Sequence, residues 1–269
     1  MSRRYLLDLA DILRAVGLDV VEVSGWQARA RKDDLGGYLD GRPTHVMVHH
    51  TASRPASDGP NDVDYIVSVS PVAPVANLYI SRRGAVYVCA AGPTNTNGAG
   101  SSKSWDGGVP DNAMNSWAIG IECANDGIGE PWPTLLTDAL VTTVKALCEA
   151  YDVSPELVRA HFEWAPTRKI DPSGPSPWAT SGKWDMNAFR ASVAPQPEPD
   201  PLPEDDPMIA IYRPVFAGAK PTDAWIAASG GACRPATSYD LTWANDNGVP
   251  VVDVVDPLQY ANLVKAAGL

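Results

Sequence analysis

Three side chains that could bind a metal ion or assist its chemistry lie close together near the middle of the chain. His161, Lys169 and Asp171 fall within eleven residues, in the stretch from Val158 to Pro172. A neutral imidazole and a carboxylate are good zinc ligands, and a catalytic zinc needs three protein ligands and an open position for water. His161 and Asp171 could supply two ligands, and a fixed ammonium at Lys169 could stabilise an oxyanion. On these residues alone, a surface loop with a chance His and Asp is the alternative.

A third ligand can come from an earlier segment that is rich in histidine. The run from His45 to Ala52 reads HVMVHHTA and holds three of the four histidines of the chain. Its alternating valines predict a β-strand, in which His45 and His49 share one face and His50 lies on the other. A histidine at the end of a buried strand can face a cleft, so we predict a metal ligand at His49. For His45 and His50 we favour structural, hydrogen-bonded imidazoles.

A carboxylate within an apolar strand is the candidate acid/base residue. The segment from Asn115 to Asp126, NSWAIGIECAND, has the alternation of a strand, and Glu122 lies among apolar neighbours. A lone buried carboxylate is costly unless it is paired or used in chemistry. Glu122 is therefore a candidate general base, and a structural salt bridge is the alternative.

The spacing of apolar residues predicts two amphipathic helices and a hairpin that would position these groups. One helix lies near the N-terminus and ends at a natural glycine C-cap (Leu6, Leu9, Ala10, Leu13, Val16 and Gly17). The second helix runs from Thr134 to Tyr151, with Thr134 as its cap and an apolar stripe (Leu136, Leu140, Val144 and Leu147). Two β-rich runs between Asn77 and Ala90 predict a hairpin that turns at Arg83 and Gly84.

Three other segments have the composition of loops. The chain from Thr51 to Val75 contains four prolines and is expected to be mostly loop. The segment from Gly92 to Pro110 is rich in Gly, Ser, Asn and Thr and is too long for a simple connection, so it is either a binding loop or flexible padding. After a strand from Val158 to His161, Pro166 and Pro172 predict a shaped loop rather than a helix.

Composition limits the classes of protein to which the chain can belong. Its 269 residues are enough for one ordinary domain and a smaller one, and 45% hydrophobic and 20% charged residues are typical of a soluble globular protein. The net charge of -11 argues against an electrostatic grip on nucleic acid or on an anionic membrane. No stretch is apolar enough to span a bilayer. The four scattered cysteines are expected to be reduced and buried.

The N-terminal segment lacks the uninterrupted apolar core of a signal peptide, because Asp8, Asp11 and Arg14 break it. We therefore expect synthesis in the cytoplasm with no export signal.

A proline-rich acidic segment divides the chain into two parts. Residues 194–207, APQPEPDPLPEDDP, favour an extended linker that cannot build a core. Residues 1–193 before it would form the main domain, and residues 208–269 a small α+β module of strands with a helix expected at Ser238–Asn247 and another at the C-terminus. The aromatic residues of this module could stack on sugars, although in so short a module we favour core positions for most of them (Tyr212, Trp225, Tyr239, Trp243 and Tyr260).

Together these motifs resemble a known family. VHHTA, the hairpin ISRRGAVY, the strand NSWAIGIE and the spacing H-x7-K-x-D are similar to zinc-dependent N-acetylmuramoyl-L-alanine amidases. Phage amidase endolysins, bacterial anhydromuropeptide amidases and peptidoglycan-recognition proteins share that fold. The resemblance covers roughly Ala10 to Val193 and implies an α/β fold with a mixed central β-sheet flanked by helices.

The resemblance also implies a role for each candidate residue. His49, His161 and Asp171 would bind Zn²⁺, Lys169 would stabilise the oxyanion, and Glu122 would be the acid/base residue. Many relatives have a cysteine as third ligand, and the aspartate found here matches the anhydromuropeptide-type branch.

Two positions depart from the family pattern. Some members carry a catalytic tyrosine where this chain has Ala76 and Asn77, so Glu122 must carry the base role. A histidine expected in the loop after the hairpin is replaced by Asn97, which affects the substrate contacts.

The function implied is a peptidoglycan hydrolase that cleaves the amide bond between N-acetylmuramic acid and L-alanine. The missing signal peptide, the linker and the extra module look most like an actinobacteriophage endolysin, a monomer that a holin releases to the wall for host lysis, where residues 208–269 would bind the cell wall. A non-catalytic peptidoglycan-binding protein on the same fold and a zinc peptidase acting on the stem peptide are the alternatives. The presence of every ligand with Lys169 and Glu122 favours an enzyme.

Overall fold

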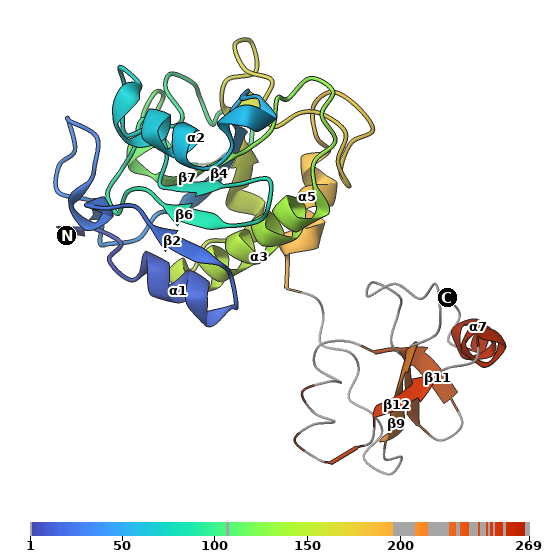
Figure 1. Ribbon diagram of the computed structural model, residues 1–269. Helices are drawn as coiled ribbons and strands as arrows, with labels where there is room; N and C mark the ends of the chain where they lie inside the picture. Colours follow the sequence, from blue (N-terminus) through green and yellow to red (C-terminus); the bar gives the residue numbers. More distant parts are fainter. Residues whose placement is uncertain are drawn as a thin grey trace. The chain divides into compact units, whose positions relative to one another are not determined.

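The computed structural model divides the chain into two compact units, Met1–Pro195 and Gln196–Leu269, which are described separately (Figure 1). In the first unit it describes residues 2–105 and 108–195. In the second it describes residues 208–214, 226–229, 232–236, 242, 246, 248–249, 251–254 and 257–266.

A mixed six-stranded sheet forms the centre of the first unit, as expected for the α/β fold. Its strands lie in the order β2-β6-β5-β7-β4-β8. Their bounds are β2 Val20–Glu22, β6 Val86–Val88, β5 Leu78–Ile80, β7 Ala118–Cys123, β4 His45–His50 and β8 Val158–Ala160. The four strands β5, β7, β4 and β8 are mutually parallel, whereas β6 is antiparallel to β5 and parallel to β2. The short strands β1, Arg3–Arg4, and β3, Tyr38–Leu39, form a separate antiparallel pair.

Helices cover both faces of this sheet. On one side lie α1, Leu9–Ala15, α3, Thr134–Tyr151, and α5, Met186–Val193, and on the other lies α2, Pro60–Asp64 (Figure 1). The predicted apolar stripe of α3 is buried in the core (Leu136, Leu140, Val144 and Leu147). The sheet therefore has apolar cover on both faces, which leaves its edges and strand ends as the places for polar chemistry.

Most predicted elements of the first unit are confirmed. The N-terminal helix, the hairpin β5–β6 and the strands at His45–His50 and Ala118–Cys123 lie where the patterns placed them. The helix α5 was not predicted. The described cysteines, Cys89, Cys123 and Cys148, are buried and free.

Two local predictions are wrong, and a third segment contains a helix that was not predicted. The N-cap of α3 is Pro133, and Thr134 is already helical, because the fixed φ of proline suits the entry to the helix. The stretch after β8 is not only loop, since α4, His161–Trp164, begins at once. The segment from Thr51 to Val75 is loop-rich as expected, but it also contains α2, which continues as a π-helical turn through Tyr65–Val69.

The second unit contains a four-stranded sheet in the order β11-β10-β9-β12. Its strands are β9, Met208–Pro214, β10, Ile226–Ser229, β11, Ala232–Pro235, and β12, Val251–Val254. The helix α7, Pro257–Ala266, packs against β11 and β12. The predicted strands and C-terminal helix are present, and β11 was not predicted.

Other predictions for the second unit fall on residues outside the description. They are the helix expected at Ser238–Asn247, except for Thr242 and Asp246, and the linker after Pro195. Of the aromatic residues, Tyr212 and Tyr260 are half-buried, and Trp225, Tyr239 and Trp243 lie outside the description.

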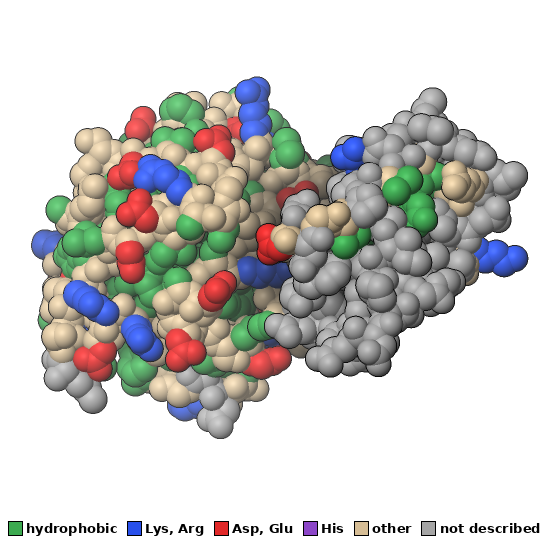
Figure 2. All heavy atoms as spheres, turned by 90° about the horizontal axis from the view of Figure 1, so that it is seen from below, with side chains coloured by type: hydrophobic (Ala, Val, Ile, Leu, Met, Phe, Trp, Pro, Cys, Tyr) green, Lys and Arg blue, Asp and Glu red, His purple; other side chains and the backbone are tan. Residues whose placement is uncertain are grey.

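The surface of the first unit carries charges of both signs. On the face drawn in Figure 2, acidic and basic side chains are interspersed over the coloured part of the molecule. All four histidines are buried (His45, His49, His50 and His161). Within the described residues, no helix combines the length and apolar character needed to cross a membrane.

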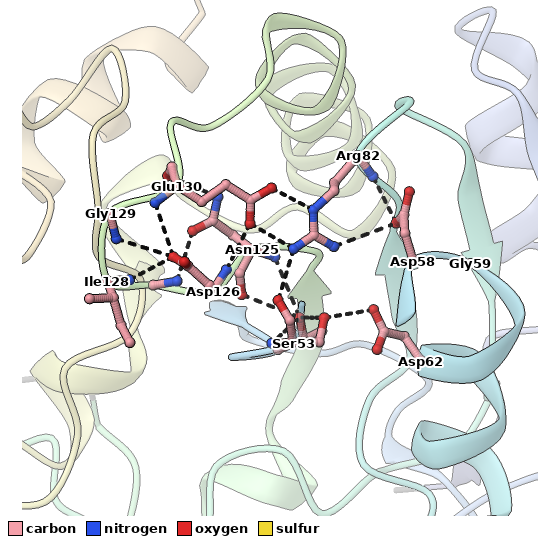
Figure 3. Close-up of polar contacts among 12 residues, drawn as sticks. Ser53, Asp58, Gly59, Asp62, Arg82, Asn125, Asp126, Ile128, Gly129 and Glu130 are labelled. Carbon is pink, nitrogen blue, oxygen red and sulfur yellow. Dashed lines mark hydrogen bonds and ion pairs between the residues drawn. The ribbon is translucent and has the colours of Figure 1, made fainter. Parts of the chain in front are cut away.

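One buried ion pair fastens the hairpin to the loop that follows β7. Arg82 donates from Nε and Nη2 to the carboxylate of Glu130 over 2.6 and 2.7 Å, and the two side chains are only 10% and 17% exposed. Arg82 also donates to the Ser53 carbonyl over 2.8 Å and lies 4.0 Å from Asp58 (Figure 3). Such a pair stabilises only while both partners are present.

Replacing Glu130 by Ala should therefore destabilise the first unit by about 3 kcal/mol, because it leaves the Arg82 guanidinium buried without the carboxylate that accepts its two short hydrogen bonds. Urea unfolding followed by tryptophan fluorescence measures the change. Asp111→Ala is the control, since it removes an equally short ion pair, 2.7 Å from Lys103, whose side chains are 81% and 48% exposed. Its midpoint should stay at the wild-type value. Equal midpoints for the two variants would contradict a stabilising role for the buried pair.

Candidate metal centre

The three predicted ligands come from parallel strands that end at the same edge of the sheet. In the parallel pairing of β4 with β8, Val48 lies opposite Ala160. His161, one residue beyond β8, is therefore level with His49. The third side chain, Asp171, comes from the loop after α4, which the hydrogen bond from the Phe162 amide to the Asp171 carbonyl holds against the helix over 3.1 Å.

The ligand atoms of these side chains converge in the interior. The Nδ1 atoms of His49 and His161 lie 2.9 Å apart, and each lies 3.0 Å from Oδ2 of Asp171. Among the described residues these three form a group able to hold a metal ion, with all ligand atoms within 4.8 Å of one another. The side chains are buried, with exposed fractions of 1%, 3% and 7%.

The protons available in this group do not satisfy its lone pairs. His161 donates from Nε2 to the carbonyl of Asn97 over 2.8 Å, so its Nδ1 carries a lone pair toward the other two side chains. Burial, and then the nearby His161, lower the pKa of His49 to about 4, so this imidazole is neutral at pH 7. Its Nε2 is buried and has no hydrogen-bond partner in the described part of the chain.

The pKa of the third side chain has the direction that a metal ligand requires. Burial raises the pKa of Asp171, but hydrogen bonds with His161 and His49 outweigh it and hold the pKa below its usual value. The neutral imidazole of His49, Nδ1 of His161 and the carboxylate of Asp171 thus converge as N and O ligand atoms. A divalent cation that accepts N and O ligands fits this set.

Two contacts near His161 were not evident from the sequence. The Asn97 carbonyl positions the ring of His161, and Glu163 caps the start of the helix that begins with it. The Asn97 carbonyl also accepts a hydrogen bond from Nη2 of Arg168 over 3.0 Å, and the same nitrogen donates to the Ala99 carbonyl over 2.7 Å. Glu163 accepts the Ala160 amide over 2.9 Å at the start of α4. A backbone carbonyl that orients a ligand histidine is a common supporting contact, but no residue type signals it.

Glu122 lies beside the three ligands. In the parallel pairing of β4 with β7 it is directly opposite His49. Its Oε2 is buried without a hydrogen-bond partner, and the described residues offer it no ion pair, which leaves the salt-bridge alternative without support. Burial, and next the charge of Asp171, raise the pKa of Glu122 to about 8, while Lys169 acts in the opposite direction.

Four of the five candidate residues face a common cleft of about 580 Å³. Glu122, His161, Lys169 and Asp171 line it. The positive charge of Lys169 lowers the pKa of both His49 and Glu122, so its ammonium faces the same centre. The cleft thus brings together a possible base, a cation and two possible metal ligands, with His49 in contact with both ligands behind its wall.

The remaining histidines have other partners. His50 accepts the amide of Ser173 at Nδ1 over 3.2 Å. Nδ1 of His45 lies 2.7 Å from the hydroxyl of Thr44, and its ring contacts the edge of Trp105. Neither belongs to the group of three ligands, as their structural interpretation anticipated.

Asn77 and Asn97, at the two positions that depart from the family pattern, differ in their hydrogen bonding. Asn77 is structural, because its side chain donates to the carbonyls of Ala90 and Gly92 and accepts the amide of Gly120. The side-chain amide of Asn97 is fully buried and has no hydrogen-bond partner within the described part of the chain. The Gly92–Pro110 loop therefore contributes at least Asn97 and Gly98 to the cleft wall.

The fold and the site together define a mixed α/β protein with a candidate three-ligand metal centre at the carboxyl edge of its sheet. Comparison with known families then identifies a specific relationship. Residues 39–174 match the Amidase_2 family, described as N-acetylmuramoyl-L-alanine amidase. The chain belongs to this family.

Individual relatives are more distant. The N-acetylmuramoyl-L-alanine amidase AmiD of Escherichia coli (strain K12) is 27% identical over 178 residues, which cover 63% of this chain and 62% of that protein. The chain therefore spans less than two thirds of the curated relative that it matches. A crystal structure of an AmpD derivative is 24% identical, with a TM-score of 0.44, covering 65% of this chain and 99% of the other. The Ph2119 endolysin from a Thermus scotoductus bacteriophage is 16% identical, with a TM-score of 0.43 and the same coverages.

The purified protein should bind one zinc ion per chain, and the Ala variants of His49, His161 and Asp171 should each lose it, because each removes one of three ligands. Metal analysis after dialysis against zinc-free buffer measures the stoichiometry. His50→Ala is the matched control, a histidine adjacent in sequence whose Nδ1 bonds Ser173, and it should keep the metal. Zinc loss in His50→Ala with retention in His49→Ala would show that the wrong histidine was chosen.

Proposed function

We propose that this protein is a zinc-dependent N-acetylmuramoyl-L-alanine amidase that hydrolyses the bond between the lactyl group of muramic acid and L-alanine in bacterial peptidoglycan. One observation carries the proposal. In a chain of the amidase family, His49, His161 and Asp171 converge within hydrogen-bond distance of one another, at a cleft lined by His161, Asp171 and the unpartnered carboxylate of Glu122.

The residues of the chain divide the chemistry between them. His49, His161 and Asp171 would hold the zinc ion, which when bound supplies Lewis acidity and lowers the pKa of water toward neutrality. Glu122 would take the proton from the attacking water and return it to the leaving amine of L-alanine. A carboxyl group whose pKa is raised toward the working pH suits both transfers. Lys169 would stabilise the negative charge that develops on the carbonyl oxygen.

Two alternatives keep the same site but change its use. A non-catalytic peptidoglycan-binding protein would need neither the base nor the cation. The complete set of three ligands with Glu122 and Lys169 supports the enzyme over this alternative. A zinc peptidase would use the same groups on a bond within the stem peptide, so only product analysis separates it from the amidase.

Digestion of purified peptidoglycan by the zinc-loaded protein tests the reaction. An amidase releases stem peptides with free L-alanine N-termini and leaves muramic acid lactyl groups on the glycan. New amino groups at other residues of the stem would identify a peptidase. Binding to the polymer without any new amine would identify the non-catalytic alternative.

Glu122→Gln and Lys169→Ala should retain zinc and lose turnover. Removal of one group that stabilises the transition-state oxyanion typically costs about a hundred- to a thousand-fold in kcat, and loss of a general base about a hundred- to ten-thousand-fold. Initial rates on soluble muropeptides, with zinc content measured on the same samples, give both values. Near-normal turnover in Glu122→Gln would remove it as the acid/base residue.

The biological role and the second unit extend this proposal. We infer a phage endolysin, a monomer made in the host cytoplasm and released to the wall by a holin, with residues 194–207 as a linker and 208–269 as a wall-binding module. The Pro-rich acidic linker and a separate second unit are the features that support it. Expression in host cells with and without a membrane-permeabilising pore tests the role, because an endolysin lyses cells only when the pore opens.

A fragment ending near Pro199 should remain folded and should cleave soluble muropeptides at near-normal rates, since linkers mark boundaries that few contacts cross. On intact walls it should be slower, because a second binding module raises the local concentration of the enzyme. Residues 208–269 carry four basic and five acidic side chains, so wall binding should depend only weakly on salt. A tagged 208–269 fragment that stays in the supernatant at every salt concentration would contradict the wall-binding role.

A further inference from the structure

An isoleucine beside the candidate metal centre is unusually exposed. Ile128 has 86% of its surface open to solvent, more than any other large hydrophobic side chain in the described part of the chain. It lines the cleft together with Ile170, which is 56% exposed. A single exposed apolar side chain on a surface needs no explanation, but Val72 and Tyr65, 54% and 53% exposed, also line this cleft, and four such side chains at one cleft indicate a binding contact.

The turn that carries Ile128 is held in one conformation. Oδ1 of Asp126 accepts the amides of Ile128, Gly129 and Glu130 over 2.8, 3.2 and 3.1 Å. Oδ1 of Asn125 accepts the amide of Gly127 over 2.8 Å. Figure 3 shows these bonds gathered inside the turn, with the side chain of Ile128 pointing away from them.

The base of this turn is fastened to the rest of the site. The Asp126 amide donates to Oε2 of Glu130 over 3.1 Å, and that carboxylate is the one paired with Arg82. Gly127 has a φ of +71°, and a Cβ there would lie 2.1 Å from the ring of His50. The Ser173 hydroxyl donates to the Gly127 carbonyl over 2.5 Å. The turn therefore rests on the segments that carry the candidate ligands.

These contacts fix the backbone that carries the exposed Ile128 side chain before any ligand binds. Less conformational entropy of the protein is therefore lost on binding. The chemistry of the rim indicates which part of a ligand fits. Aliphatic side chains pack against methyl and methylene groups, whereas sugars prefer the face of an aromatic ring. The aromatic residue of the cleft is Tyr65, which follows α2, and Figure 3 shows α2 and the Ile128 turn on opposite sides of Ser53.

Cations next to the aliphatic pair favour the same assignment. Arg168 and Lys169 directly precede Ile170 and line the cleft with it. A peptidoglycan stem peptide combines alkyl groups with carboxylates, and this side of the cleft offers the isoleucines to the former and Arg168 to the latter, with Lys169 assigned to the oxyanion. We propose that Ile128, with Ile170, is a specificity-determining contact for the aliphatic part of the stem peptide; the assignment rests on the proposed function in naming peptidoglycan as the ligand.

Binding measured in the absence of turnover tests this contact. In a zinc-loaded Glu122→Gln background, Ile128→Ser should raise the Kd for a muramoyl tetrapeptide about tenfold, the effect of losing roughly two buried methylene groups. Isothermal titration calorimetry measures the Kd. Leu135→Ser in the same background is the matched control, because Leu135 is 64% exposed and does not line the cleft. It should leave the Kd unchanged. Both substitutions are at exposed positions, and equal thermal midpoints confirm that both variants are folded. An unchanged Kd in Ile128→Ser overturns the proposal.

The identity of the bound group is tested by proton contacts. In a sample with ¹³C-labelled isoleucine methyl groups, Ile128 methyl signals are assigned from their loss in Ile128→Ser. They should show nuclear Overhauser effects to alkyl protons of the stem peptide. Effects to sugar ring protons alone would make the glycan the occupant and overturn the assignment.

Two substitutions separate the hydrogen-bonding role of the Asp126 side chain from its negative charge. Asp126→Asn keeps an oxygen at Oδ1 that can accept the three amides, whereas Asp126→Ala removes it. Affinity near wild type in Asp126→Asn with weaker, entropically less favourable binding in Asp126→Ala supports presentation of Ile128 by a fixed turn. Equal losses in both variants would assign the effect to charge and contradict that step.

The amidase reaction and the Ile128 contact can be rejected independently of each other. Digestion that releases no free L-alanine N-terminus, together with a tenfold effect of Ile128→Ser on binding, would reject the reaction and keep the contact. Normal digestion with no effect on binding would do the reverse.

Discussion

The parallel pairing of β4 with β7 and β8 is the constraint on which the candidate site depends. The register places Glu122 opposite His49 and brings His161 level with both, although these residues lie far apart in sequence. Side chains alternate along a strand, so a slip of one residue would send His49 to the opposite face of the sheet. The apolar residues of the same strands, such as Val46 and Ile119, are fully buried and oppose such a slip. The core therefore specifies the geometry of the site.

This geometry has a cost in stability. Nε2 of His49 and Oε2 of Glu122 are buried without hydrogen-bond partners in the described chain. An unsatisfied buried polar atom typically costs about 1–3 kcal/mol. Sites that perform chemistry often carry such groups, because a side chain already satisfied by the protein cannot respond to a substrate or to an ion. The ion pair of Arg82 with Glu130, only a short distance along the chain from Glu122, shows that the same region can satisfy its buried charges.

The sequence predicted the parts of the fold and of the site that local patterns encode. Strand alternation located His49 and Glu122, and helical spacing located α3, because each signal lies within one element. The start of α4 at His161 was missed, since the two prolines that argued for a loop, Pro166 and Pro172, follow its last helical residue, Trp164. Local sequence patterns do not reveal contacts between residues that are far apart in the chain. The Asn97 carbonyl, which fixes the tautomer of His161, is a backbone group, and only the folded chain brings it within 2.8 Å.

The turn that carries Ile128 is hydrogen-bonded, directly or through Ser173, to the segments that carry two of the candidate metal ligands. The Gly127 carbonyl accepts the hydroxyl of Ser173, and Ser173 is two residues beyond Asp171. The Ser173 amide in turn donates to His50, the neighbour of His49. A ligand that packs against Ile128 therefore contacts a unit bonded to the segments of two candidate metal ligands. Since packed interiors deform little, this arrangement would hold an alkyl group bound at Ile128 at a fixed distance from the candidate metal centre, as the orientation of a substrate for the proposed hydrolysis would require.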